Sequence, residues 1–289
     1  MAESSCNVSF PSMSVALDAL LSGTLCLQWN EAPTPLDPLG KDLWLKDEGR
    51  NLSESWTDRV AAVLVTAARA CGLTEIHLPA LPELPAVDQN TLAVSLAIYA
   101  AKAQLSAKVA LGEPCSEADF LRIQASGAQI VSNIDTKIRS SAIIQIDNWI
   151  DQAKKIAVGL IRVELEKQWG SNGVQTILWP THDEIRVRGM LPIPADIGVT
   201  AGLPEIKLVK HNENEVTLDC WKRYAQRGWL FAPETASAIA YYEQAAANLG
   251  PTVIVNPRSA LAASQELAAW TGLRRYPTRM PVGGIITPQ

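Results

Sequence analysis

The chain has 289 residues, of which 47% are hydrophobic, and its 30 acidic and 25 basic side chains give a formal net charge of −5. This length suits one large domain or two lobes with a sizeable core. The charges are spread along the chain, so no dense Lys/Arg face is expected for nucleic acid or an anionic membrane. No apolar run approaches the roughly 18–20 residues of a membrane span, and the N-terminal segment lacks a signal-peptide pattern. Composition therefore predicts a cytoplasmic protein without nucleic-acid or membrane partners.

Cysteine and histidine are too sparse to predict a disulfide framework or a metal centre. The five cysteines are an odd set without close spacing, which argues against a disulfide-stabilised fold. The three histidines are far apart, and no CxxC or HxxxH pattern brings potential ligands together. Metal ligands in sequence motifs normally show such short spacings, so no metal site is expected.

The first half of the chain alternates between strand and helix patterns. Residues 43–46 alternate apolar and polar side chains as a strand does. From Ser55 the apolar residues recur every three or four positions, which predicts a helix that begins with a Ser55–Asp58 capping box and ends at Gly72. The same criteria predict further elements: a strand at 76–78, a helix at 90–104, a strand at 107–111, a helix at 117–126 and a strand at 129–131.

The second half continues the alternation. A long helix is predicted over 147–169, followed by a buried apolar strand over 175–178. Later elements are a strand at 205–209, helices near 218–227 and 233–248, and a strand at 252–255. Short apolar strands that alternate with helices are typical of an α/β fold with parallel sheets.

Residues 44–51, Trp-Leu-Lys-Asp-Glu-Gly-Arg-Asn, carry a resemblance to the threonine synthase-like branch of the fold-type II pyridoxal-phosphate (PLP) enzymes, the tryptophan synthase β-like superfamily. In that family a strand ending in Lys-Asp-Glu-Gly leads through Asn-Pro-Thr-Gly-Ser-Phe-Lys-Asp-Arg into a helix. This chain has Asn-Leu-Ser-Glu-Ser-Trp-Thr-Asp-Arg at residues 51–59. Similarity continues in patches at 96–103, 126–128, 179–181, 228–238 and 256–260.

This resemblance implies a two-lobed α/β architecture with parallel-rich sheets flanked by helices. The smaller lobe would span residues 52–140, and the larger lobe would comprise residues 1–51 and 141–289, with a cleft between them. Because the resembling enzymes usually pair through the larger lobe, a homodimer or a complex with a partner protein is also expected.

The first departure from the family pattern is at the lysine that holds the cofactor. That lysine aligns with Thr57, while Ser55, Asp58 and Arg59 match around it. An imine requires a primary amine, which a hydroxyl does not supply. We therefore expect no bound PLP.

The second departure is at the loop that holds the cofactor phosphate. Glycines in that loop let backbone N–H groups converge on the phosphate, but here the strand continues through residues 179–181 into a charged segment, 182–190. If catalysis occurs there, the candidate residues are His182, Asp183 and Glu184. Arg186 and Arg188 could bind a small anion or carboxylate ligand, since guanidinium groups suit both. An ion-pair network that merely fills the space is an equal alternative.

The third departure is at the loop that contacts the cofactor ring. Asn90 aligns near the family asparagine, although it could equally be the N-cap of the next helix. Ser259 aligns with the partner of the ring nitrogen, in an environment that has lost its glycines. The candidate substrate-binding residues outside the charged segment are therefore Ser55, Thr57, Asn90 and Ser259.

Two functions are compatible with these departures. The first is a homologue without PLP that works as a binding or partner protein, a pseudoenzyme, in amino-acid-related or secondary metabolism. The second is a PLP-independent enzyme, such as a lyase, isomerase or cyclase, that uses the cleft for acid–base chemistry. Loss of three separate cofactor contacts argues against a working PLP enzyme, and the non-catalytic function is narrowly preferred.

Overall fold

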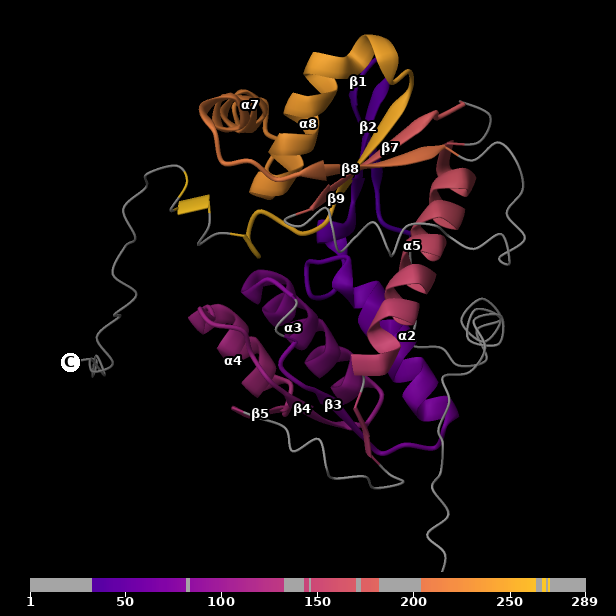
Figure 1. Cartoon of the computed structure of the whole chain (residues 1–289), viewed down its shortest axis with the longest axis vertical. Helices are drawn as coiled ribbons and strands as arrows, with labels where there is room; N and C mark the ends of the chain where they lie inside the picture. The colour runs from indigo at the N-terminus through magenta and orange to yellow at the C-terminus, as the bar shows by residue number, and fades with distance from the viewer. Residues whose placement is uncertain are drawn as a thin grey trace, which may run out of the picture.

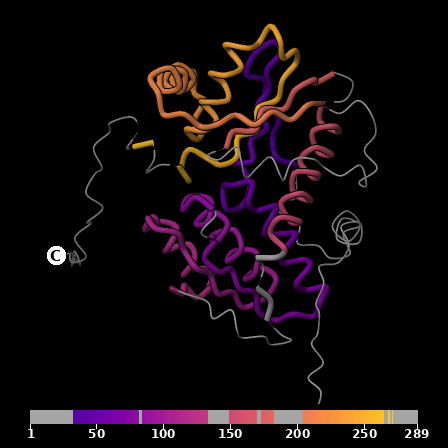
Figure 2. The backbone as a smooth tube through the Cα atoms, in the orientation of Figure 1, coloured from indigo at the N-terminus to yellow at the C-terminus, as the bar shows by residue number. Residues whose placement is uncertain are grey.

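The computed structural model describes residues 33–81, 84–132, 143–145, 147–169, 173–181, 204–263, 267–268 and 270. Figure 1 shows two sheets, each accompanied by helices, one above the other in this view. The tube in Figure 2 shows the chain descending from the upper sheet into the lower one and returning along a long helix. The described residues include no helix long and apolar enough to cross a membrane.

The upper sheet has five strands in the order β1-β2-β9-β7-β8. β1 is antiparallel to β2, while β2, β9, β7 and β8 run parallel to one another. Strands β7 and β9 are buried along their whole length, as expected for parallel strands covered on both faces. The bounds are β1 Leu36–Gly40, β2 Leu43–Asp47, β7 Thr176–Thr181, β8 Glu205–Lys210 and β9 Thr252–Asn256.

The lower sheet has four strands in the order β5-β4-β3-β6, all parallel. Its bounds are β3 Glu75–Leu78, β4 Ser106–Val109, β5 Gln129–Ile130 and β6 Ile143–Gln145. The helices are α2 Thr57–Ala70, α3 Ala86–Lys102, α4 Glu117–Ala125, α5 Asp147–Trp169, α7 Glu215–Ala225 and α8 Pro233–Ala245, with short 3-10 turns η1 Glu48–Arg50 and η3 Ala246–Asn248.

Helix α5 contributes to the cores of both sheets. Its first half, including Ile156, packs in the cluster that also contains α2, α3, β3 and β4. Its second half, including Leu165, packs against β7 and β9 in a separate cluster. Figure 1 shows the same helix running beside α2 below and reaching the five-stranded sheet above. One 23-residue helix therefore joins these two hydrophobic clusters, one from each sheet.

The structure confirms the mixed α/β class with parallel-rich sheets, and α5 has the predicted bounds. Two local expectations were wrong. Helix α3 begins at Ala86, so Asn90 lies inside it and is not its N-cap. The N-cap of α2 is Trp56, and Asp58 binds Ser53 instead of closing a capping box with Ser55. The division into lobes at residues 52–140 stays a prediction.

Candidate functional site

The site is built where β2 and β9 end side by side. Because these strands are parallel, their carboxyl ends meet at one sheet edge, where open α/β sheets commonly bind ligands. Asn256 Nδ2 donates to Asp47 Oδ1 at 2.7 Å, which ties the two strand ends together. A Cβ at Gly49 would lie 2.7 Å from the backbone nitrogen of Ser259. Only glycine therefore lets the two segments approach this closely.

A buried ion pair connects the end of β2 to the start of α2. Arg59 Nε donates to Glu48 Oε2 at 2.7 Å, and both side chains are almost fully buried. Thr34 Oγ1 donates to the other Glu48 oxygen, and Asn51 Nδ2 donates to Oε2, each at 2.7 Å. Burial alone would raise the pKa of Glu48, but Arg59 and Lys46 with these hydrogen bonds hold it below its usual range.

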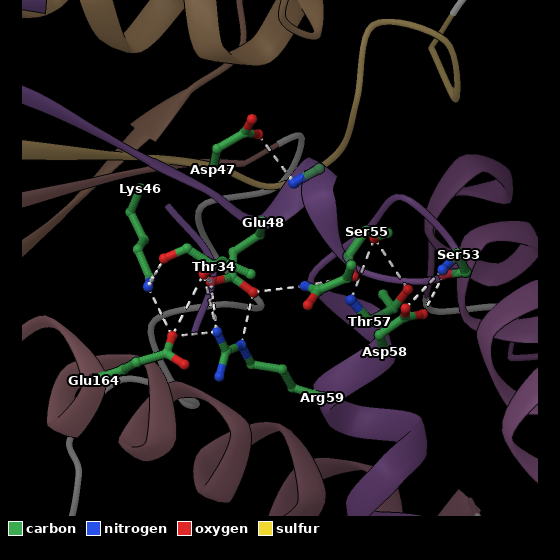
Figure 3. A network of polar contacts seen from close by, with 12 residues as sticks. Thr34, Lys46, Asp47, Glu48, Ser53, Ser55, Thr57, Asp58, Arg59 and Glu164 are labelled. Carbon is green, nitrogen blue, oxygen red and sulfur yellow. Dashed lines mark hydrogen bonds and ion pairs between the residues drawn. The ribbon is translucent and has the colours of Figure 1, made fainter. Parts of the chain in front are cut away.

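The same network reaches α5 through Glu164. Lys46 Nζ lies 2.7 Å and Arg59 Nη2 lies 2.5 Å from Glu164 Oε2, so two cations face two carboxylates (Figure 3). Lys46 Nζ also donates to the Thr34 carbonyl and to Gln168. Burial lowers the pKa of Lys46, an effect that Glu164 opposes. The network joins β2, α2 and α5.

Beside this network lies a second group, here called the hydroxyl cluster, made of Ser53, Ser55, Thr57, Ser95 and Asp58. Thr57 Oγ1 donates to Ser55 Oγ at 3.0 Å and lies 2.7 Å from Ser95 Oγ. Ser95 Oγ lies 2.7 Å from Ser53 Oγ, and the Ser53 hydroxyl is hydrogen-bonded to Asp58 Oδ1. Figure 3 shows Ser53, Asp58, Thr57 and Ser55 at the start of α2. All five side chains are buried.

Residues 257–259, here called the strap, run alongside residues 54–56. Trp56 N donates to the Pro257 carbonyl at 2.8 Å, and Ser259 N donates to the Glu54 carbonyl at 2.9 Å. The Ser259 hydroxyl donates to Glu54 Oε2 at 2.8 Å. Glu54 has a φ of 66°, in the left-handed region that favours glycine. The strap and the loop before α2 are therefore joined by backbone and side-chain bonds.

Arg258 and Asn90 are engaged in contacts of their own. Arg258 Nε donates to Glu234 Oε1 at 2.6 Å, and both side chains are buried. Asn90 Oδ1 accepts from Gly112 N at 2.8 Å, and Asn90 Nδ2 donates to the carbonyls of Gly112 and Pro114. The asparagine thus holds the loop after β4 against α3.

The structure brings together some of the predicted site residues. Ser55 and Thr57 are in direct contact, and Ser259 reaches the same loop through Glu54. The bonds of Asn90 lead to the loop after β4 and not to this group. The remaining candidates lie outside the described residues, so their role stays a prediction: His182, Asp183, Glu184, Arg186 and Arg188.

Sequence reasoning missed several residues of the site. Glu48, Asp58 and Arg59 lay in the matched motif, and the motif was the available signal for them. No sequence signal marked Glu164 or Ser95, because each lies in the middle of a helix and reaches the site through tertiary packing. Within the described part of the chain, no group of three or more His, Cys, Asp or Glu side chains is placed to hold a metal.

The residues around position 57 do not fit a lysine-bound PLP. Thr57 offers a hydroxyl that is already hydrogen-bonded within the cluster. Lys46, the lysine of the neighbouring network, directs its ammonium to Glu164, Gln168 and the Thr34 carbonyl. In the described residues, therefore, the hydroxyl cluster contains no amine that could form an imine.

Comparison with protein-family models and with curated proteins finds no match. Among solved structures, the serine racemase from Dictyostelium discoideum matches with a TM-score of 0.60 and 11% sequence identity. The match covers 86% of this chain and 96% of that one. At this identity the likeness shows the fold alone, an α/β architecture like that of the fold-type II PLP enzymes.

Proposed function

We propose that this chain belongs to the threonine synthase-like branch of that fold and acts without PLP, as a binding or partner protein in amino-acid-related or secondary metabolism. The observation that carries the proposal is the hydroxyl of Thr57, which stands where the resemblance places the imine lysine. That hydroxyl is bonded to Ser55 and Ser95 in a buried cluster. A pseudoenzyme of this kind would use its surface or its cleft and not imine chemistry.

Two further contacts support the proposal. The Ser259 hydroxyl, the candidate partner of the ring nitrogen, donates to the Glu54 carboxylate. Its neighbour Arg258 forms a buried ion pair with Glu234. Both side chains therefore already have partners within the protein, and a cofactor ring would have to compete with them.

The experiment is to purify the protein with PLP present and record its visible spectrum. We expect no band at roughly 410–430 nm, the region of lysine-bound PLP. We expect the same for Thr57→Lys, because a restored amine leaves the charged segment 182–190 in place of the phosphate loop. A band in the unsubstituted protein that borohydride abolishes would contradict the proposal. A band in Thr57→Lys alone would show that the rest of the cofactor site is intact.

We also propose that the protein forms a homodimer or binds a partner protein. The hydrophobic fraction of 47% supports this, as do large apolar side chains such as Leu230 and Leu261, which are 66% and 71% exposed. Apolar surface is a common basis of association. Light scattering over a wide concentration range should give a mass above 31.3 kDa, or a pull-down should recover a defined partner. A monomer at all concentrations with no partner recovered would contradict this expectation.

A further inference from the structure

We infer that Arg162 and Glu166 of helix α5 form a binding site for an α-amino acid with an apolar side chain. The guanidinium of Arg162 would bind the carboxylate of this ligand, and the carboxylate of Glu166 would bind its ammonium group. The inference is independent of the proposed function, because neither residue belongs to the motif at residues 44–59 and neither bears on the loss of PLP.

The inference starts from two charged side chains that have polar atoms without partners. Arg162 Nε and Glu166 Oε1 are both buried, and neither atom has a hydrogen-bond partner among the described residues. Each side chain is otherwise only partly buried, so a ligand can reach it. Burial lowers the pKa of Arg162, an effect that the charge of Glu166 opposes, and a guanidinium stays protonated in proteins. Buried polar atoms without partners are rare in native proteins because each costs free energy. Two such atoms of opposite charge fit a ligand that carries both charges.

The order of the two residues along the helix disfavours a bond between them. They are four residues apart, but the base precedes the acid, whereas the acid-first order suits the helix dipole better. The other flank of α5 is different, because Glu164 there contacts both Lys46 and Arg59. One polar flank of the helix is therefore satisfied by the protein, and the other is not.

The register of the upper sheet places the unsatisfied flank over β8. One row of residues crosses the sheet beneath α5, in the order Lys46, Val255, Trp179 and Leu208. The Lys46 end of this row meets Glu164. Residues 162 and 164 are about 200° apart around the helix axis. The flank that carries Arg162 and Glu166 therefore faces the Leu208 end of the row.

Strand β8 supplies an apolar surface beside the two charges. Ile206 and Leu208 pack against the same hydrophobic cluster as the second half of α5, yet both are only partly buried. β8 is also the last strand of the five-stranded sheet in the described structure. An apolar side chain bound here would cover this partly exposed surface.

The spacing of the two charges suits an α-amino acid. Side chains four residues apart on a helix have Cβ atoms about 5–6 Å apart, and the ammonium and carboxylate of an α-amino acid are held on one carbon atom. A guanidinium binds a carboxylate through two parallel hydrogen bonds. The combination of one cation, one anion and an apolar surface therefore matches all three parts of this ligand.

Calorimetric titration of the full chain with L-valine, L-leucine and L-phenylalanine tests the ligand class. We expect saturable binding of at least one of them. Its analogues that lack either the ammonium or the carboxylate, for L-leucine 4-methylpentanoate and 3-methylbutylamine, should bind at least about tenfold more weakly, because each leaves one charged group without a partner. No saturable binding of any of the three amino acids would overturn the inference, as would equal binding of the analogues.

Single substitutions test the two residues. Arg162→Gln and Glu166→Gln should each weaken binding of the amino acid by about tenfold or more. The matched control is Lys167→Gln, an exposed charge on the same helix, which should leave the affinity unchanged. Unchanged affinity in either of the first two variants would show that the ligand binds elsewhere.

A double substitution separates a ligand site from a structural pair. Arg162→Met combined with Glu166→Met removes two charges that have no partner in the ligand-free protein, so it should raise the melting temperature and abolish binding. A lowered melting temperature, or a variant that does not fold, would show that the two groups stabilise the protein without a ligand. Either result would overturn the inference.

Discussion

Arg59 forms ion pairs with two carboxylates of the site, Glu48 and Glu164. Its guanidinium holds Glu48 and Glu164 together in a region from which water is largely excluded. A buried carboxylate that loses its cation keeps the full cost of desolvation, which exceeds the value of an exposed ion pair severalfold. The network is therefore best tested by removing one partner and comparing the result with an exposed pair nearby.

We expect Arg59→Met to lower the free energy of unfolding by about 3–5 kcal/mol, because the buried Glu48 carboxylate loses its ion pair while it keeps its hydrogen bonds to Thr34 and Asn51. Arg50→Ala is the matched control, since Arg50 is 73% exposed and pairs with Asp47 at 3.2 Å. It should change stability by less than about 1 kcal/mol. Urea unfolding measures the stability of both variants. Equal losses of stability would show that burial does not determine the strength of the ion pair between Arg59 and Glu48.

For single residues, the sequence could indicate which positions match the family motif, but not which side chains contact one another. The matched motif contains Ser55, Asp58 and Arg59, of which only Ser55 was predicted as a site residue. It could not show that Asp58 turns to Ser53, because two donors of Ser53 within reach of one carboxylate outcompete a capping box. Nor could it show that Glu164, more than a hundred residues along the chain, faces Arg59.

At the scale of elements, the strap and the turn after β2 are in close backbone contact at Gly49 and Ser259. Gly49 in η1 faces the backbone of Ser259, and a Cβ there would lie 2.7 Å from a nitrogen atom that belongs to the main chain. Backbone cannot move aside as the end of a flexible side chain can, so a side chain at residue 49 must displace the strap or η1.

We therefore expect Gly49→Ala to destabilise the protein by about 1–3 kcal/mol, the usual cost of overpacking, and to speed amide exchange in the strap. Gly40→Ala is the control, because its Cβ would meet only Leu43 Cβ at an ordinary 3.9 Å. Thermal unfolding and hydrogen exchange compare the two. Equal behaviour of both variants would mean that the strap is not held by this contact.

The helices and strands were predicted most accurately where the hydrophobic periodicity extends over many residues. The helix at 147–169 was predicted with its observed bounds, since 23 residues give many turns of consistent spacing. Helix α3 begins at Ala86, four residues before the predicted start, because Pro85 provides a suitable start and Asn90 is used to bind Gly112. Strand β6 was not predicted, and it pairs with β3, a strand more than sixty residues earlier in the chain.

At the scale of the whole molecule, alternating strands and helices predicted the α/β class with parallel sheets. The resemblance of residues 44–59 predicted the fold-type II architecture, which the serine racemase structure supports. The pattern alone could not show which strands are neighbours, since β2 pairs with β9 across more than two hundred residues. Such pairings depend on tertiary packing and leave no local signal.

Helix α5 contributes buried side chains to the cores of both sheets. Ile156 and Leu165 are both fully buried on this helix, but they belong to different hydrophobic clusters. A rigid helix that is shared by two cores cannot lose one of them without exposing apolar side chains of the other. The two sheets should therefore unfold together, although each has its own core.

We expect Ile156→Ala and Leu165→Ala each to lower one common unfolding transition, by about 2–5 kcal/mol, the range for deleting a large buried aliphatic side chain. Gln152→Ala, at an exposed position of the same helix, should leave the transition nearly unchanged. Calorimetry with circular dichroism at several wavelengths distinguishes one transition from two. If Leu165→Ala shifts one transition and leaves a second at its original temperature, α5 does not couple the two cores, and the sheets unfold independently.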